Sequence, residues 1–534
     1  MEEIFREVGP WHTRIFLIAI LGHVPFGLFV MSMSFMAPKL DFTCKTWAIT
    51  LPPEPAVNST YNRCYFKDDE QVIKCIEWDY DHRIHKRTLI EEWNAVCDRA
   101  WIVSLAQGML MLGMLVGCFV FALVSDWYGR KPSFIAAQVI TIMSGFASSF
   151  TPAFGWFCFL RFIAAMGHGG KRMANTLAVE SVGSGQRAVV TVGQDLGWCI
   201  GMLATPLVTY FVRDWVWIQR LVVLPEFFFL YLAIVVDESP KWLLSAGRFE
   251  EARQILHQIV ERNKLDPNID VDLIVETTRG ALMHETHMKK GSIRDLLREK
   301  HIMILTTSFW IQFLVVILVY YQMIYYIVEI SEDSYLSVIY MGLIEIPATL
   351  SAWYIVKTYH RKPVYNFFYT SAIIATAALM SCPEGAATIK MLIANVGKLA
   401  FIVLYNCLAV HVAECYPTKV RSVAIGTSQT ASRIGAVVAP FLLAFSIITA
   451  EWVPLALALV LTAIAAFCSL SLPETFGKEL PNTFHEMKIL LHTERKSRRT
   501  EEMEATESKT KELAQTRSTD AKTANNEQRT LPTS

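Results

Sequence analysis

Five ionisable side chains stand inside long apolar stretches of this chain, where a charge has little solvent. They are Asp195, Glu226, Glu345, Lys398 and Arg433. On insertion scales, each charge costs about 2.5–3.5 kcal/mol at the centre of a membrane helix, so such residues usually face a water-filled cavity and serve a function. Because both signs are present, we expect a site for charged solutes.

The chemistry of these side chains suits an organic ion. A guanidinium at Arg433 can hold a carboxylate through two parallel hydrogen bonds. A carboxylate at Glu345 can face an ammonium group, so the pair would suit a zwitterion. The alternative is that the charges neutralise one another as buried ion pairs without touching a solute. The sequence leaves that alternative most open for Asp195 and Glu226.

Catalytic and metal-binding patterns offer no competing interpretation. The string His284-Glu285-x-His287 is one residue short of the spacing that places two zinc ligands on one helix face. No serine elbow accompanies it. His23 and His168 could line a path or relay protons, although a hydrogen-bonded packing histidine is the commoner case. We expect no metal, no cofactor and no enzymatic activity.

The elements that must position these charges are membrane helices. Of 534 residues, 53% are hydrophobic and 18% charged, against about 25% charged in soluble proteins. Lys+Arg and Asp+Glu number 49 each, so bulk charge does not support nucleic-acid binding. The apolar residues fall into blocks of about 20, long enough to cross a bilayer as helices. The expected helices are 15–37, 101–124, 133–150, 155–178, 188–212, 215–236, 302–328, 335–356, 364–381, 389–413, 422–446 and 452–472.

Lys and Arg residues in the short loops set the expected orientation. With both termini in the cytoplasm, the inner loops hold most of these residues, and the segment 38–100 lies outside. That segment carries an N-glycosylation acceptor at Asn58. It also carries four cysteines, which predict two disulfides in an oxidising space, with three possible pairings. These cysteines are Cys44, Cys64, Cys75 and Cys97; the other seven should be thiols in or near the helices.

The chain divides into four expected parts. Residues 1–236 form an N-terminal six-helix bundle, 237–301 a cytoplasmic connector, 302–477 a C-terminal six-helix bundle and 478–534 a mostly disordered cytoplasmic tail. The bundles match each other internally: one common spacing separates Glu180 from Glu414 and Arg187 from Arg421. Such a duplication favours a central path between two halves that rock against each other.

Several strings carry a family resemblance. The segment from Ser125 to Pro132, Ser-Asp-Trp-Tyr-Gly-Arg-Lys-Pro, resembles the major facilitator signature G-x-x-x-D-R-x-G-R-R/K, with Ala122 for its glycine and Trp127 for its first arginine. Further strings follow in order: Glu238-Ser239-Pro240-Lys241-Trp242, Gly247-Arg248-Phe249-Glu250-Glu251, Glu414-Cys415-Tyr416-Pro417-Thr418 and Pro473-Glu474-Thr475-Phe476-Gly477. Over nearly its whole length, the chain thus resembles the organic cation, carnitine and organic anion transporter family of the major facilitator superfamily.

The resemblance implies a fold and a site. The fold is all-α, with twelve transmembrane helices in two pseudo-symmetric bundles. Gln194 and Tyr321 match pocket-lining positions of the family, beside the five membrane charges. The positions of Lys398 and Arg433 resemble the anion and carnitine carriers, whereas Glu345 resembles the acidic position of the cation branch. An acidic residue at the position of Glu226 is unusual for the family, so the resemblance assigns it no role.

Charges at the cytoplasmic helix ends form a candidate gate. Opposite charges bridging the halves would favour an outward-open state, and their separation would accompany inward opening. The alternative is a basic face that only sets topology. The gate candidates are Asp126, Arg130, Glu180, Arg187, Glu238, Arg361, Glu414, Arg421 and Glu474.

The expected function is secondary transport of small organic ions across the plasma membrane by alternating access, with zwitterions or organic cations such as carnitine-like amines as substrates. Two alternatives are an organic anion exchanger of the same fold and a receptor or scaffold that binds solutes without moving them. The expected partners are the organic ion and the lipid bilayer, with Na⁺ or H⁺ as candidate coupling ions and no nucleic acid.

Overall fold

A computed structural model describes most of the chain: residues 4–5, 9–47, 60–61, 64–68, 71–183, 187–266, 269–285, 292–331, 333–383, 385–450, 452–478, 481, 483–484, 486–487 and 489. The predicted glycosylation site at Asn58 and nearly all of the predicted tail lie outside these residues. The backbone of Arg187 is described, but its side chain is not.

The N-terminal half of the chain forms the first set of predicted membrane helices. The first predicted segment divides into two helices at Gly22 and His23, and the fourth divides at Lys171. In chain order the helices are α2 (Pro10–Leu21), α3 (Val24–Met36), α5 (Trp101–Tyr128), α6 (Arg130–Ala147), α7 (Phe154–Gly170), α8 (Arg172–Glu180), α9 (Arg187–Phe211) and α10 (Trp215–Val235).

The C-terminal half forms six long helices over the remaining predicted segments. They are α15 (Lys300–Ile330), α16 (Ser334–Thr358), α17 (Arg361–Ser381), α18 (Ala387–Cys415), α19 (Thr418–Ile448) and α20 (Trp452–Ser469). All twelve predicted segments are therefore helical. Nine helical segments in the described part of the chain are long and apolar enough to cross a bilayer.

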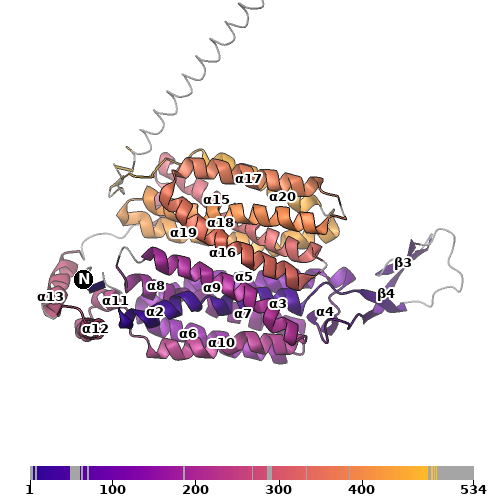
Figure 1. The fold of residues 1–534 in the computed structure, drawn as a ribbon, viewed down its shortest axis with the longest axis horizontal. Coiled ribbons are helices and arrows are strands. Elements are labelled where there is room, and N and C mark those ends of the chain that lie inside the picture. Colours follow the sequence, from indigo (N-terminus) through magenta and orange to yellow (C-terminus); the bar gives the residue numbers. More distant parts are fainter. Residues whose placement is uncertain are drawn as a thin grey trace, which may run out of the picture.

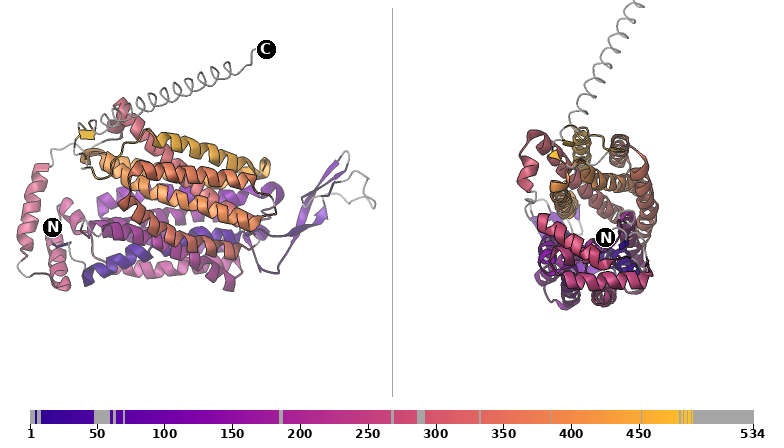
Figure 2. Two further views of the ribbon diagram at one scale, coloured as in Figure 1. Left: turned by 45° about the horizontal axis from the view of Figure 1, so that its top comes forward. Right: turned by 90° about the vertical axis from the view of Figure 1, so that its left-hand side faces the viewer.

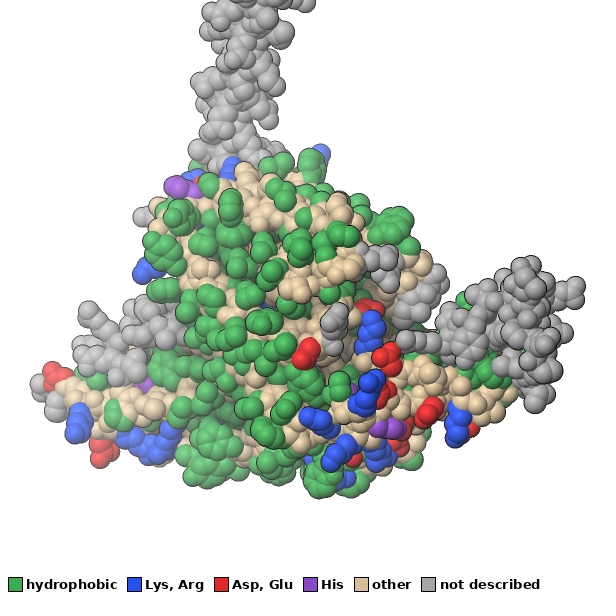
Figure 3. Space-filling view, turned by 45° about the vertical axis from the view of Figure 1, so that its right-hand side comes forward, with side chains coloured by type: hydrophobic (Ala, Val, Ile, Leu, Met, Phe, Trp, Pro, Cys, Tyr) green, Lys and Arg blue, Asp and Glu red, His purple; other side chains and the backbone are tan. Residues whose placement is uncertain are grey.

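The two halves lie side by side as two layers of nearly parallel helices (Figure 1). An end-on view separates them clearly (Figure 2). Between the halves, α5 packs against α19 and α9 packs against α16. Hydrophobic side chains cover the flank of the bundle, while charged side chains gather toward its ends (Figure 3). This distribution is the one that a bilayer requires.

Short helices between the halves lie at one end of the bundle, which we call the connector end (Figure 1). They are α11 (Pro240–Ser245), α12 (Phe249–Asn263), α13 (Val271–Glu285) and α14 (Ile293–Leu297). Apolar side chains of α12, among them Leu256 and Ile259, are buried in one cluster with residues of α2 and α8. The Trp11 Nε1 atom also donates to Asp237 Oδ2 over 2.9 Å. The connector is thus fastened to the N-terminal half.

A small sheet projects from the opposite end of the bundle, the loop end (Figure 1). Its strands are β1 (Phe42–Trp47), β2 (Thr60–Tyr61), β3 (Tyr65–Asp68) and β4 (Gln71–Tyr80), arranged in the order β1-β4-β3-β2. The register pairs Phe42 with Tyr80 and Tyr65 with Lys74. The short helix α4 (Leu89–Glu92) follows. The sequence analysis placed this segment outside the membrane but predicted no strands in it.

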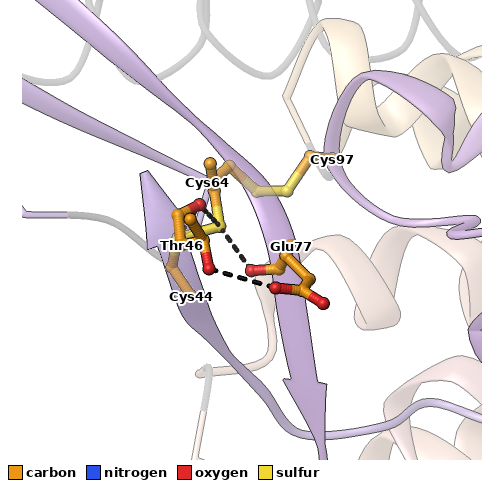
Figure 4. The surroundings of a disulfide bond; sticks show 6 residues. Cys44, Thr46, Cys64, Glu77 and Cys97 are labelled. Atoms are coloured by element: carbon orange, nitrogen blue, oxygen red, sulfur yellow. Dashed lines mark hydrogen bonds between the residues drawn. A yellow bond between two sulfur atoms is a disulfide. The ribbon is translucent and has the colours of Figure 1, made fainter. Parts of the chain in front are cut away.

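Two disulfides fasten this segment, as the cysteine count predicted. They join Cys44 to Cys75 and Cys64 to Cys97, which settles the three possible pairings. Beside the first, Thr46 Oγ1 donates to Glu77 Oε2 over 3.1 Å (Figure 4). The remaining seven cysteines are free thiols.

Candidate functional site

A cavity of about 410 Å³ lies between the two halves, near the middle of the bundle. Its wall reaches toward the connector end, where Thr176 and Ala409 lie within two turns of the ends of α8 and α18. The helices of both halves contribute, as a path between rocking halves requires. Its charged lining residues are Lys171, Arg172, Asp195, Glu345 and Arg433, together with His23 and His168.

Arg433 presents an uncompensated guanidinium to this cavity. It lies in the middle of α19, and no described side chain forms an ion pair with it within 4 Å. Its Nε atom is buried without a hydrogen-bond partner among the described residues. A buried donor without a partner costs about 1–3 kcal/mol. An acceptor from a solute would remove this cost.

Asp195 and Arg172 face the same space from α9 and α8. They interact electrostatically with each other, but no hydrogen bond or ion pair within 4 Å joins Asp195 to any described side chain. The carboxylate therefore stays available to a cationic group. Arg172 adds a second guanidinium to the wall.

Glu345 also lines the cavity, but its two oxygens are already occupied. The Lys398 Nζ atom lies 2.9 Å from Glu345 Oε2 and 3.2 Å from the carbonyl oxygen of Met341. On the other oxygen, Glu345 Oε1 accepts from Trp198 Nε1 over 3.0 Å and from the Tyr320 hydroxyl. Lys398 has no exposed surface and does not line the cavity. Lys398 and Glu345 thus form a buried ion pair inside the C-terminal half.

Aromatic rings supply much of the remaining wall. Tyr320 and Tyr321 lie edge to face, with ring centroids 5.3 Å apart. Phe26 and Trp198 approach to 5.2 Å on the opposite half. Tyr405 also lines the cavity, and its hydroxyl donates to Gln429 Oε1 over 2.9 Å. Such rings attract organic cations through their faces without demanding one solute shape.

Glu226 lies behind the wall rather than in it. Its Oε1 atom pairs with Lys171 Nζ and lies 3.7 Å from His168 Nε2. Lys171 Nζ is also 3.0 Å from His168 Nδ1. Lys171 and His168 do line the cavity, so these two side chains connect the cavity surface with the buried carboxylate of Glu226.

Most of the predicted site residues meet in one place. Arg433, Asp195, Glu345, Gln194 and Tyr321 all line the cavity, whereas Lys398 and Glu226 sit behind it as partners of Glu345 and Lys171.

Three cations of the fourth predicted segment were not among the predicted site residues. Arg161, Lys171 and Arg172 all fall within residues 155–178, and their charges in an apolar stretch are the signal that could have predicted them. Arg161 is fully buried, and its Nη1 and Nη2 atoms donate to Gln219 Oε1 over 3.0 Å and to the carbonyl oxygen of Phe29 over 3.1 Å. In and directly behind the cavity wall, four cations (Lys171, Arg172, Lys398, Arg433) then face three carboxylates (Asp195, Glu226, Glu345).

The gate candidates form two similar clusters at the connector end, one in each half. In the first, Arg130 Nη2 lies 3.1 Å from Glu180 Oε1 and Arg130 Nη1 lies 2.8 Å from Asp126. In the second, Arg361 Nη2 lies 2.7 Å from Glu414 Oε1. Among the described side chains of these clusters, no ion pair crosses between the halves.

A carboxylate that follows the last long helix of each half, α10 or α20, completes each cluster. Glu238 accepts from the backbone N–H groups of Arg130 and Lys131, both over 3.1 Å. Glu474 likewise accepts from those of Arg361 and Lys362 over 3.0 Å each. Each acid thus satisfies free N–H groups at the start of a helix.

The environments of these two acids differ. Burial raises the pKa of Glu238 despite its backbone hydrogen bonds. Burial also acts to raise the pKa of Glu474, but its three backbone donors outweigh that effect and hold the pKa below its usual 4.5.

Arg421, the last gate candidate with a described side chain, joins neither ion pair. Its guanidinium donates to the carbonyl oxygens of Tyr416 and Pro481 over 3.0 and 3.2 Å. It therefore ties the start of α19 to the segment after α20.

The halves are joined toward the loop end instead. In the described part of the chain, the hydrogen bonds that cross between them include those from Gln107 Nε2 to the Tyr325 hydroxyl over 3.1 Å, from Trp198 to Glu345, and from the Tyr335 hydroxyl to the carbonyl oxygen of Thr209 over 3.5 Å. Helices α5 and α19 approach each other closely here: a Cβ atom on Gly108 would lie 2.5 Å from the ring of Phe441, and the ring would have to shift. The halves therefore touch at the loop end, while their charged clusters at the connector end pair separately.

A second cavity of about 310 Å³ lies on the loop side of these contacts. Gln107 and Tyr325 line it. Tyr325 lies one helical turn after Tyr321, which lines the central cavity. Its rim carries Lys39 and Glu329. The Gln107–Tyr325 hydrogen bond thus lies in the wall of the second cavity, on the side where Tyr321 lines the central cavity.

Among the described residues, no group of three or more His, Cys, Asp and Glu side chains is placed to hold a metal ion. His287 of the near-zinc string lies outside those residues.

The sequence profile of the family described as "Sugar (and other) transporter" matches residues 57–486. An organic cation transporter protein of Drosophila melanogaster is 27% identical over 510 residues, covering 90% of this chain and 92% of that protein. The human organic cation/carnitine transporter 2 is 26% identical over 418 residues, covering 77% and 74% of the two chains.

Solved structures give the same fold. The xylose transporter XylE from E. coli, in an inward open conformation, superposes with a TM-score of 0.63 at 18% identity, covering 90% of this chain and 99% of that chain. A second XylE structure, of the major facilitator superfamily proton:xylose symporter with a bound glucose derivative, superposes with a TM-score of 0.60 at 19% identity.

Proposed function

The chain belongs to the sugar (and other) transporter family and has the major facilitator fold of twelve membrane helices in two bundles. We propose that it transports small organic ions that carry a carboxylate. Zwitterions such as carnitine-like amines are the first candidates. The similarity to an organic cation transporter protein and to an organic cation/carnitine transporter supports organic ions as the substrate class.

One observation carries this proposal: among the described residues, the guanidinium of Arg433 and the carboxylate of Asp195 line the cavity without an ion pair within 4 Å. Arg433 offers its donors to a carboxylate, and a hydrogen bond to a charged group contributes about 1.5–3 kcal/mol. Asp195 and the rings of Tyr320, Tyr321 and Trp198 offer a place for an ammonium group. The predicted role of Glu345 passes to Asp195, because Lys398 already neutralises Glu345.

The arrangement of contacts supports alternating access. The halves meet at the loop end and pair separately at the connector end, so solute would reach the cavity from the connector end in this state. Rocking of the halves would break the Gln107–Tyr325 and Tyr335–Thr209 hydrogen bonds and open the other side. With the connector in the cytoplasm, as the loop charges predict, this is an inward-facing state. The disulfide-bonded sheet would then lie outside the plasma membrane, where disulfides persist.

One alternative substrate class has a specific observation in its favour. The cations in and behind the wall outnumber the carboxylates by one, which favours an organic anion over an organic cation without a carboxylate. An exchanger of organic anions therefore remains the second candidate. A receptor that binds without moving solute is the third.

Uptake into proteoliposomes tests the three candidates together. Radiolabelled carnitine, p-aminohippurate and tetraethylammonium serve as the zwitterion, the monoanion and the cation. We expect saturable uptake of carnitine, slower uptake of p-aminohippurate and the least uptake of tetraethylammonium. Preference for tetraethylammonium would contradict the role of Arg433, and binding without saturable uptake of any solute would favour a receptor.

A further inference from the structure

Lys171, Glu226 and His168 form a buried ionic cluster in the N-terminal half that the solute site above does not use. Their side chains are 7%, 2% and 1% exposed. Lys171 stands at the break between α7 and α8, His168 lies on the last turn of α7, and Glu226 comes from α10. The rings of Phe26 and Phe29 pack on His168, at 5.8 and 4.6 Å between centroids. The cluster is therefore dry on one side and open to the cavity on the other.

The hydrogen bonds fix the proton positions within the cluster. An ammonium group can only donate, so His168 Nδ1 accepts from Lys171 over 3.0 Å. The imidazole is then neutral, with its proton on Nε2, which lies 3.7 Å from Glu226 Oε1. Glu226 Oε2 is buried without a partner among the described residues. Lys171 alone therefore neutralises Glu226.

Among the described residues, no other group around the cluster forms an ion pair with Glu226 within 4 Å. On α6 the nearest polar side chain is Gln138, whose Nε2 donates to the backbone oxygen of Glu226 over 3.4 Å. His23, at the start of α3, and Arg161, on α7, act on His168 electrostatically. Arg161 is held by other partners, as described above. Loss of Lys171 would leave the carboxylate of Glu226 uncompensated.

We propose that this cluster couples proton movement to transport of the carboxylate-bearing solute, an inference that rests on the proposed function. Lys171 lines the same cavity as Arg433, so the solute carboxylate that Arg433 holds also attracts the Lys171 ammonium and draws it away from Glu226. A buried carboxylate that loses its partner costs about 3–5 kcal/mol, and protonation removes that cost. Solute and proton therefore bind together and leave together.

The proton reaches Glu226 through His168. When Lys171 moves away, Nδ1 of His168 is free to accept a proton from cavity water. The imidazole then passes its Nε2 proton to Glu226 Oε1, which leaves His168 neutral and Glu226 as a carboxylic acid. When the solute departs, Lys171 returns, and the same steps release the proton. Each cycle carries one proton in the direction of one solute.

The test uses the purified full chain in proteoliposomes with a pH-sensitive dye inside. Carnitine or p-aminohippurate is added with the outside at pH 5.5 and the inside at pH 7.5. Each pH unit is tenfold in proton activity, so this gradient can drive at most about a hundred-fold accumulation. We expect uptake several-fold faster than at pH 7.5 on both sides, with acidification of the interior only when solute is present.

Glu226→Gln is the informative variant, because it mimics the protonated acid. We expect it to lose both the acidification and the stimulation by the gradient, while exchange of labelled for unlabelled solute at equal pH continues. Glu251→Gln, which changes an exposed acid of the connector, is the matched control and should respond like the unmodified chain.

The outcomes separate the two proposals. Solute uptake by the unmodified chain without acidification would overturn the coupling but leave the proposed function intact. Acidification by Glu226→Gln would also overturn it. Absence of any solute uptake would contradict the proposed function itself. Solute uptake without acidification by the unmodified chain would overturn the coupling even where the Glu226→Gln variant does not fold.

Discussion

The ion pair between Lys398 and Glu345 gives a prediction whose size follows from the structure. Lys398→Met removes the cation 2.9 Å from Glu345 Oε2 and leaves a carboxylate that is 3% exposed. Breaking a buried pair by removing one partner costs about 3–5 kcal/mol. Trp198 and Tyr320 still donate to Oε1, so we expect a loss near 3 kcal/mol in the free energy of unfolding.

Neutralising the partner should recover most of that loss. In Lys398→Met combined with Glu345→Gln, the amide oxygen still accepts from Trp198 and Tyr320, and no buried charge remains. Replacing both members of a buried pair is often nearly neutral. We expect the double variant to lie within about 1 kcal/mol of the unmodified chain, which corresponds to a coupling energy of at least about 2 kcal/mol.

Denaturant unfolding in detergent, followed by tryptophan fluorescence, measures these free energies for the unmodified chain, both single variants and the double variant. If Lys398→Met were as stable as the unmodified chain, or if the double variant lost the sum of the single losses, Lys398 would not be a structural partner of Glu345. Lys398 would then regain its predicted role as a solute ligand.

Three further changes probe the gates and the acid caps. Tyr325→Phe removes a hydrogen bond worth about 0.5–1.5 kcal/mol between the halves, so we expect a twofold to tenfold increase in labelling of Met114→Cys, in the central cavity, by a membrane-impermeant thiol reagent added at the loop end; unchanged labelling would argue against a gate there. Glu474 has a lowered pKa, so its stabilising effect is present above pH 4.5 and is lost as the pH falls through the folded-state pKa; Glu474→Gln should flatten the acid side of the stability profile, and an unchanged profile would contradict this. Reversing Glu180 and Arg130 together should recover part of the uptake lost on reversing either, and a double variant no better than the worse single one would speak against their pairing.

The helices could be predicted from sequence because hydrocarbon leaves a chain few choices. A run such as Ile302 to Val328 must satisfy its backbone within itself, and α15 (Lys300–Ile330) covers it. The breaks at Gly22 and Lys171 were not predicted, because both lie in stretches that remain apolar on average. The sheet at the loop end was missed although Val72, Ile73 and Trp78 are typical strand residues.

The site could be predicted only in part, because a sequence shows which charges are buried but not how they pair. Arg433 and Lys398 look alike as charges in apolar helices, yet one faces the cavity and the other faces Glu345. That difference depends on the rotation of α18 and α19 relative to α16, which tertiary packing sets. The same limit applies to the predicted gate, because the sequence does not show which charges pair across the halves. Arg130 and Arg361 lie at matching positions, but each pairs within its own half.

The most direct test of the account compares Arg433→Gln with Arg220→Gln, which changes an arginine of α10 that contacts Phe150 and Trp217 instead of the cavity. Uptake of carnitine and of choline, which lacks the carboxylate, is measured for both variants. Arg433→Gln should raise the KM for carnitine about tenfold to a hundredfold, in line with the loss of about 1.5–3 kcal/mol from a charged hydrogen bond, and should leave choline uptake unchanged; Arg220→Gln should alter neither. Equal effects of Arg433→Gln on both solutes, or no effect on either, would contradict the carboxylate site.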